Sequence, residues 1–321
     1  MKKVRLVILM LILPNMFIGF ISCRKDSING NADVTRISKI KLAWTRKFHD
    51  YWVIADIDYV KDKISSINLN QNSRNSDQGI ISKFEYKNET LSRNDYSLEQ
   101  ISGKETFTFS GSKLIQWLAE NNVNDQFVPL EEIQYEYENA NLTSYTHYIG
   151  ETLWPFEQKR FSYEGAKIKN LKAYYNNQPY YLNTVQYDLN YEGMYTYQDT
   201  NLLNIDLKYY MPVVNCRFTF VYEGSRIAKI IKQIVDNPAE QLINLFEFTY
   251  DKSGRMVKIN YNSGIENSEN AASSAEWDFE YENGKSNIKF DVDKILWKIT
   301  EIDASLFPEK IINDFFTIYP E

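Results

Sequence analysis

Apolar and polar residues alternate along most of the chain. Trp277, Phe279 and Tyr281 take every second position with an acid between each pair, and the stretches 185–191 and 246–250 show the same alternation. A period of two with one polar face is typical of antiparallel strands that bury one side of a sheet. The pattern therefore predicts an all-β fold.

The strands come in nine loose copies of one unit, spaced 23 to 31 residues apart. Each copy has an aromatic anchor, a short polar turn and, in most copies, an Ile or Leu five residues after the anchor. The anchors are Tyr59, Tyr86, Phe109, Tyr137, Tyr163, Tyr191, Tyr222, Tyr250 and Tyr281. The second strand is poorly defined in the Tyr191 and Tyr281 copies. Internal periods of this length indicate a repeat architecture, here of β-hairpins.

Turn chemistry supports this register. Two residues after the anchor stand Asn88, Gly111, Asn139, Gly165, Gly193, Gly224 and Asn283. Glycine, and to a lesser degree asparagine, tolerates the positive φ that a tight hairpin turn needs. We therefore expect a hairpin turn at each of these positions.

Nine hairpins imply about eighteen strands, more than the ~10 at which open twisted sheets usually curl or split. We therefore predict an antiparallel meander over residues 46–304, rolled on itself or folded into two layers, with the aromatic residues inside. A membrane-spanning barrel is disfavoured, because Lys167, Lys169 and Lys172 put charge on both faces of one strand. Residues 305–321 are predicted to cap the sheet, with a short helix that begins at Pro308 and includes Phe316.

The N-terminus has the features of a secretory signal. Lys2, Lys3 and Arg5 precede an apolar stretch that ends at Ser22, directly before Cys23. The apolar stretch is shorter than the ~20 residues that a membrane-spanning helix needs. Ser22-Cys23 resembles the bacterial lipobox, which implies a signal peptide over 1–22 and a lipid on Cys23. The polar residues that follow predict a flexible tether over 23–45.

Residues 248–259 read Phe-Thr-Tyr-Asp-Lys-Ser-Gly-Arg-Met-Val-Lys-Ile. This stretch resembles the YD repeat of RHS-type proteins, and the whole chain resembles uncharacterised Gram-negative lipoproteins with YD-like hairpin repeats. The copies at 163–165, 191–193 and 222–224 depart from the motif with Tyr-Glu-Gly. RHS-type proteins use such strands as a shell around a toxin. The chain shows no toxin domain, so the resemblance implies the fold alone.

Catalytic and metal-binding motifs are not evident in the sequence. His49 and His147 are the only histidines, and neither has a Cys or His at metal-ligand spacing. We expect no metal and no cofactor. The formal charge of −7, with Lys and Arg interspersed among the acids, argues against a nucleic-acid partner.

Two acid pairs leave an alternative open. Asp56 and Asp58, and likewise Asp291 and Asp293, lie two residues apart and so on one strand face. Paired acids can bind calcium or carry glycoside hydrolysis. The polar positions of an alternating strand also produce such pairs. We therefore predict that the protein is not an enzyme, with a glycosidase as the weaker alternative.

Aromatic residues in the connections between repeats are the candidate binding residues. They are Trp154, Tyr180, Tyr181, Tyr209 and Tyr210. Strand pairing does not require them, and exposed aromatic rings can stack on sugars or anchor a partner. The alternative is that they fold back over the end of the sheet.

These observations predict a lipoprotein of the cell envelope, anchored to a bacterial membrane through its N-terminal lipid. We expect it at the outer membrane, on the periplasmic or the external side. Its expected role is that of a non-enzymatic binding module for an envelope protein or a glycan. A glycan-binding subunit of a nutrient-uptake system is the alternative.

Overall fold

The computed structural model describes residues 35–46, 49–71, 80–97, 100–178, 184–210, 213–236, 244–263, 274–286, 288–290 and 316–318. They belong to the second of two compact units, residues 33–321. The described residues form twenty β-strands and no helix. No helix in this part of the chain is therefore long and apolar enough to cross a bilayer.

The strands are β1 (Thr35–Arg46), β2 (His49–Val60), β3 (Lys63–Gln71), β4 (Ile80–Lys87), β5 (Thr90–Ser97), β6 (Gln100–Ser110), β7 (Lys113–Val123), β8 (Gln126–Glu138), β9 (Asn141–Ile149), β10 (Trp154–Glu164), β11 (Lys167–Asn176), β12 (Tyr187–Gln198), β13 (Asn201–Tyr210), β14 (Val213–Glu223), β15 (Arg226–Ile234), β16 (Asn244–Tyr250), β17 (Met256–Ser263), β18 (Ser274–Asn283), β19 (Ile288–Phe290) and β20 (Phe316–Ile318). The first eighteen form one sheet, and β19 pairs with β20.

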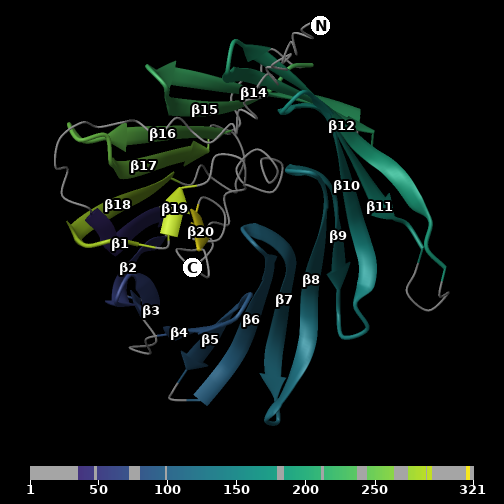
Figure 1. Cartoon of the computed structure of the whole chain (residues 1–321). Coiled ribbons are helices and arrows are strands. Elements are labelled where there is room, and N and C mark those ends of the chain that lie inside the picture. Colours follow the sequence, from purple (N-terminus) through teal and green to yellow (C-terminus); the bar gives the residue numbers. More distant parts are fainter. Residues whose placement is uncertain are drawn as a thin grey trace, which may run out of the picture. The chain divides into compact units, whose positions relative to one another are not determined.

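The eighteen-stranded sheet closes on itself. Each strand from β2 to β17 pairs with its two neighbours in sequence, and all of these pairs are antiparallel. β1 pairs with β2 on one side and with β18 on the other (Figure 1). In the β1–β18 pair, Thr35 lies opposite Asn283. The predicted all-β antiparallel meander is confirmed. The prediction left open whether the sheet is rolled or two-layered; it is one sheet rolled into a closed ring.

Two predicted boundaries differ from the structure. β1 occupies residues 35–45 of the range 23–45 assigned to the tether. The alternation of its apolar residues is broken by a bulge between Ile37 and Lys39, so the sequence pattern did not indicate a strand here. Phe316, placed in a C-terminal helix by the sequence, lies in β20 instead. Residues 291–315, with Asp291 and Asp293, lie outside the described part of the chain, as do Cys23 and the signal segment.

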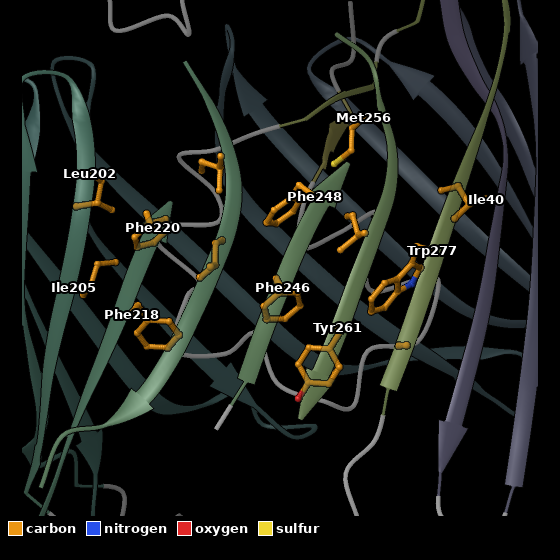
Figure 2. Close-up of a cluster of buried hydrophobic side chains, with 14 of the residues drawn as sticks. Ile40, Leu202, Ile205, Phe218, Phe220, Phe246, Phe248, Met256, Tyr261 and Trp277 are labelled. Carbon is orange, nitrogen blue, oxygen red and sulfur yellow. The ribbon is translucent and has the colours of Figure 1, made fainter. Parts of the chain in front are cut away.

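One face of the sheet carries the hydrophobic core, and we call it the core face. Its buried residues, with one given for most strands, include Ile40, Ile57, Ile67, Phe84, Leu91, Phe109, Ile133, Leu142, Phe161, Leu171, Tyr191, Ile205, Phe218, Ile230, Phe248, Ile259 and Trp277. Ile288 of β19 and Ile318 of β20 pack against this core. Figure 2 shows part of it, with rings from β14, β16, β17 and β18.

The opposite face, called the exposed face, is polar and bears ion pairs between neighbouring strands. Lys39 of β1 lies 3.0 Å from Asp56 of β2, and Lys229 of β15 lies 2.6 Å from Glu247 of β16. These charges occupy alternate positions of strands whose other residues enter the core. The period of two in the sequence thus separates a charged face from an aromatic one.

Successive repeats are joined by a tyrosine hydrogen bond. The hydroxyl of an anchor tyrosine donates to the backbone carbonyl of the aliphatic residue in the preceding hairpin. The pairs are Tyr59–Ile37 at 2.8 Å, Tyr86–Ile64 at 3.0 Å, Tyr137–Leu114 at 3.0 Å, Tyr163–Leu142 at 2.8 Å, Tyr250–Ile227 at 2.9 Å and Tyr281–Met256 at 2.6 Å. We call this contact the tyrosine latch.

A basic residue completes the latch in several repeats. The Lys or Arg directly before the aliphatic residue lies over the next anchor ring, as Arg36 does over Tyr59 at 4.2 Å and Lys63 over Tyr86 at 4.9 Å. Arg36 also donates to the carbonyl of Lys61 in the turn that follows Tyr59. In these repeats one hairpin is tied to the next by both a hydrogen bond and a cation–π contact.

The structure explains the two copies whose second strand is poorly defined in the sequence. The sixth anchor is Tyr197 rather than Tyr191, with Asp199 at φ 53° and Leu202 after it. Gly193 lies within β12 instead of in a turn, and a Cβ there would come within 2.8 Å of Leu207. The Tyr281 copy has no second strand after it because β1, from the start of the chain, takes that place. The ninth hairpin is thus shared between the two ends of the domain.

Candidate binding site at the connection end

The meander has two distinct ends. The turns within the hairpin repeats lie at one end, and the connections between hairpins, such as 124–125 and 150–153, lie at the other, which we call the connection end. Near this end three rows of residues cross neighbouring strands on the core face, each residue opposite the next. From the connection end inward, the rows are Glu131, Ile149 and Trp154; then Ile133, His147, Glu157 and Tyr175; then Tyr135, Tyr145, Lys159, Ala173, Tyr191 and Tyr209.

The innermost row contains a buried ion pair. The Lys159 side chain is fully buried, and its Nζ lies 3.6 Å from Oε2 of Glu157, which is itself 7% exposed. The ammonium also lies 5.2 Å from the ring centroid of Tyr145 and 5.9 Å from that of Tyr191. A buried charge is costly unless it is compensated. Here a carboxylate and two aromatic faces compensate it.

Tyrosines surround this ion pair. The Tyr191 hydroxyl lies 3.5 Å from Oε1 of Glu157, and the Tyr191 and Tyr209 rings are 5.0 Å apart. Burial raises the pKa of Tyr209 and of Tyr195 well above the usual value for phenols. These hydroxyls are therefore protonated at neutral pH and can donate hydrogen bonds.

The cluster becomes exposed toward the connection end. Phe156 and Tyr175 stack with ring centroids 5.2 Å apart and planes inclined by 26°, and they are 37% and 36% exposed. The His147 ring meets Phe156 edge-on at 6.0 Å. His147 Nε2 lies 3.3 Å from Oε2 of Glu131, whose side chain is 41% exposed. Two aromatic rings, an imidazole and a carboxylate thus share an accessible part of the core face.

A bulge places Phe156 in this group. In the pairing of β9 with β10, Pro155 lies opposite Tyr148 and Glu157 opposite His147, so Phe156 has no residue opposite it. Its ring contacts His147 and Tyr175, which both belong to the core face. Bulges that redirect a side chain are frequent next to binding sites. We therefore take Phe156, Tyr175, His147 and Glu131 as the candidate binding site, with Glu157 and Lys159 behind them.

The residues predicted from the sequence fall in different places. Trp154 is the first residue of β10 and lies opposite Ile149, in the outermost row. Tyr209 lies in the innermost row, whereas Tyr210 is on the exposed face and donates to Glu192. Tyr180 and Tyr181 lie outside the described residues. The structure thus brings Trp154 and Tyr209 to the same face as the candidate site and puts Tyr210 on the opposite face.

The acid pair of β2 forms no comparable site. Asp58 accepts hydrogen bonds from Ser66 at 2.7 Å and Asn68 at 2.9 Å, and Asp56 pairs with Lys39. Both acids lie on the exposed face among polar neighbours. Within the described ranges, no group of three or more His, Cys, Asp or Glu side chains is placed to hold a metal ion.

Sequence reasoning missed most residues of the candidate site. The signal was present in β10, where Glu157 and Lys159 share the alternate positions of Phe161 and Tyr163. Charged residues in the register of buried aromatic residues must be compensated by other charges or by hydrogen bonds. Such residues indicate a polar cluster within the core.

Comparisons with known proteins give no assignment. No family model matches the chain, and no curated protein matches it. Among solved structures, a porin-like protein from Bacteroides uniformis is 12% identical with a TM-score of 0.44, over 77% of this chain and 98% of that one. A porin-like protein from Bacteroides vulgatus is 9% identical with a TM-score of 0.36, over the same shares. The complex TcdB2-TccC3-Cdc42 is 8% identical with a TM-score of 0.24, over 65% of this chain and 12% of that one. At these values the likenesses are too weak to assign a function.

Proposed function

We propose that this chain is a lipid-anchored protein of the bacterial cell envelope that binds a ligand, without catalysis, at the connection end of its closed sheet. One observation carries the binding part of the proposal. Phe156 and Tyr175 remain more than one-third exposed on a face that is otherwise buried, beside Glu131 and His147. Partly exposed aromatic rings next to polar groups are the usual material of a binding site.

The proposal assigns membrane attachment to the lipid on Cys23 rather than to the strands. A strand that faces lipid carries an apolar band, and charge in that band is destabilising. The exposed face instead carries charged pairs such as Lys229 with Glu247 and Lys258 with Glu276. An acyl anchor attaches a polar domain to a membrane without burying any strand in lipid. The outer membrane, on the periplasmic or the external side, is the proposed location.

Binding is favoured over catalysis because Glu157 and Asp58 are both engaged by neighbouring side chains. A general acid or base must reach the reacting group and change its protonation. Glu157 is held by Lys159 and Tyr191 in the core. Asp58 is held by Ser66 and Asn68. Neither of these two acids is arranged to exchange protons with a substrate, so they give the glycosidase alternative no support.

Two experiments test the proposal. Metabolic labelling with a fatty acid should mark the wild-type protein, and Cys23→Ala should abolish the label and release the protein from membranes. A Cys23→Ala protein that is still processed and still fractionates with membranes would contradict the anchor. For binding, immobilised wild-type protein should retain a component of solubilised envelope that the Tyr175→Ala variant fails to retain. Equal retention by the two proteins would contradict the assigned site.

A further inference from the structure

We propose that the ligand is a neutral glycan, whose sugar rings contact Phe156 and Tyr175 and whose hydroxyls bond Glu131 and His147. This inference rests on the proposed binding function and adds the chemical class of the ligand. It follows from what the four side chains offer together and from which other ligand classes their surroundings disfavour.

The four side chains match the two sides of a sugar ring. A pyranose has an apolar face of C–H groups and a rim of hydroxyls. The C–H groups carry partial positive charge and are attracted to the negative face of an aromatic ring. Phe156 and Tyr175 supply two such rings, 5.2 Å apart and nearly parallel. The Glu131 carboxylate accepts hydrogen bonds from hydroxyls. His147 Nε2 lies 3.3 Å from Glu131 Oε2, and when Nε2 carries the proton, Nδ1 can accept a hydrogen bond from a hydroxyl.

An anionic ligand is disfavoured by the charges of the cluster. Two carboxylates, Glu131 and Glu157, lie in adjacent rows of the core face, and Lys159 is the cation next to Glu157. Lys159 is fully buried and engaged with Glu157, Tyr145 and Tyr191. An incoming anion would therefore meet a carboxylate first, at the exposed end of the cluster.

A peptide ligand is disfavoured by the closed sheet. An extended peptide would need a free strand edge for backbone pairing. Each of the eighteen strands of the closed sheet has a partner on both sides.

Adjacent residues on opposite faces provide a matched control. Tyr174 and Tyr175 are neighbours in β11, but Tyr174 lies on the exposed face, with the Arg160 guanidinium 5.2 Å from its ring centroid. Phe127 has an exposure close to that of Phe156, at 39%, and lies near the same end of the sheet with Lys104 over its ring. Tyr174 is therefore the control position for Tyr175, and Phe127 is the control position for Phe156.

The test is titration calorimetry with neutral gluco- and manno-oligosaccharides, an acidic oligogalacturonate and spermidine. We expect a neutral oligosaccharide to bind. Tyr175→Ala and Phe156→Ala should each weaken its affinity about tenfold or more. Tyr174→Ala and Phe127→Ala should leave it within about twofold, and Tyr175→Phe should retain most of it because the ring is kept. Circular dichroism and thermal unfolding of each variant would identify those that fail to fold.

The outcomes separate this inference from the proposed function. Binding of the oligogalacturonate or spermidine in place of neutral sugars would overturn the inference, and so would equal losses in the Tyr174 and Tyr175 variants. If no sugar binds but wild-type protein retains an envelope component that Tyr175→Ala loses, the glycan class is wrong and the binding function stands. If Tyr175→Ala loses neither kind of binding, both fail.

Discussion

Removal of one tyrosine latch should measurably destabilise the whole sheet. Tyr163→Phe deletes the hydroxyl that donates to the Leu142 carbonyl at 2.8 Å and leaves the ring in place. Phe fits an anchor position, because Phe109 occupies one and is 2% exposed. The substitution therefore isolates the hydrogen bond from the packing of the ring.

The expected loss is about 1 kcal/mol. A hydrogen bond within a protein contributes a net of about 0.5–1.5 kcal/mol, because the unfolded chain bonds to water instead. Tyr163 is partly buried and Leu142 is fully buried, so water has limited access to the carbonyl. The loss should therefore fall in the upper half of that range. Tyr250→Phe removes the equivalent bond to Ile227, and the two losses should add because the sites share no partner.

Equilibrium unfolding in urea would measure these losses. The midpoint should fall in each single variant and fall further in the double variant, while the slope of the transition stays constant. Tyr174→Phe is the control, since its ring lies on the exposed face, and we expect a change below about 0.5 kcal/mol. If Tyr163→Phe and Tyr250→Phe shift the midpoint no more than Tyr174→Phe does, the latch does not hold the repeats together.

Two further predictions concern alkaline pH and the turns. Burial raises the pKa of Tyr250 and of Tyr281 to about 12, from an ordinary value of 10.0. The unfolded chain therefore loses these protons at a lower pH than the folded protein does. Unfolding midpoints should be constant below pH 10 and decrease as the pH rises toward 12. A Tyr250→Phe variant with an unchanged alkaline decrease would refute this. Gly165→Val and Gly224→Val, at φ 63° and 64°, should each cost about 1 kcal/mol or more. The cost of Gly165→Asn should be smaller, because Asn88 adopts φ 53° in another copy, and equal thermal stabilities for the Val and Asn variants would contradict the strain argument.

The repeats could be predicted because their markers are local. A positive φ in a tight turn restricts the residue at that position, and Asn88, Gly111, Asn139, Gly165 and Gly224 all adopt one. The sequence places the sixth anchor at Tyr191 because Gly193 stands two residues after it, at the spacing of a turn residue. In the structure an aspartate takes the positive φ of that turn, six residues further on.

What depends on distant parts of the chain could not be predicted. The partner of β18 is β1, which is more than two hundred residues away in sequence and has its alternation broken by a bulge. The candidate site also depends on register, because Glu131, His147 and Phe156 meet only when β8, β9 and β10 are aligned. The sequence places Tyr209 and Tyr210 in a connection, whereas in the structure they are the last two residues of β13. The period of two therefore sends their two rings to opposite faces.

The hairpin shared by β18 and β1 gives this repeat domain no first or last unit. Linear repeat proteins end in specialised repeats that shield the last exposed interface, whereas here the two ends shield each other. We therefore expect that the chain can be cut at a tight turn and rejoined between Thr35 and Asn283, which lie opposite each other, without losing a strand pair of the eighteen-stranded sheet. The same arrangement delays closure of the sheet until the end of the domain has been synthesised. Until β18 emerges, β1 and the growing end are both unpaired edges, which can pair with other chains.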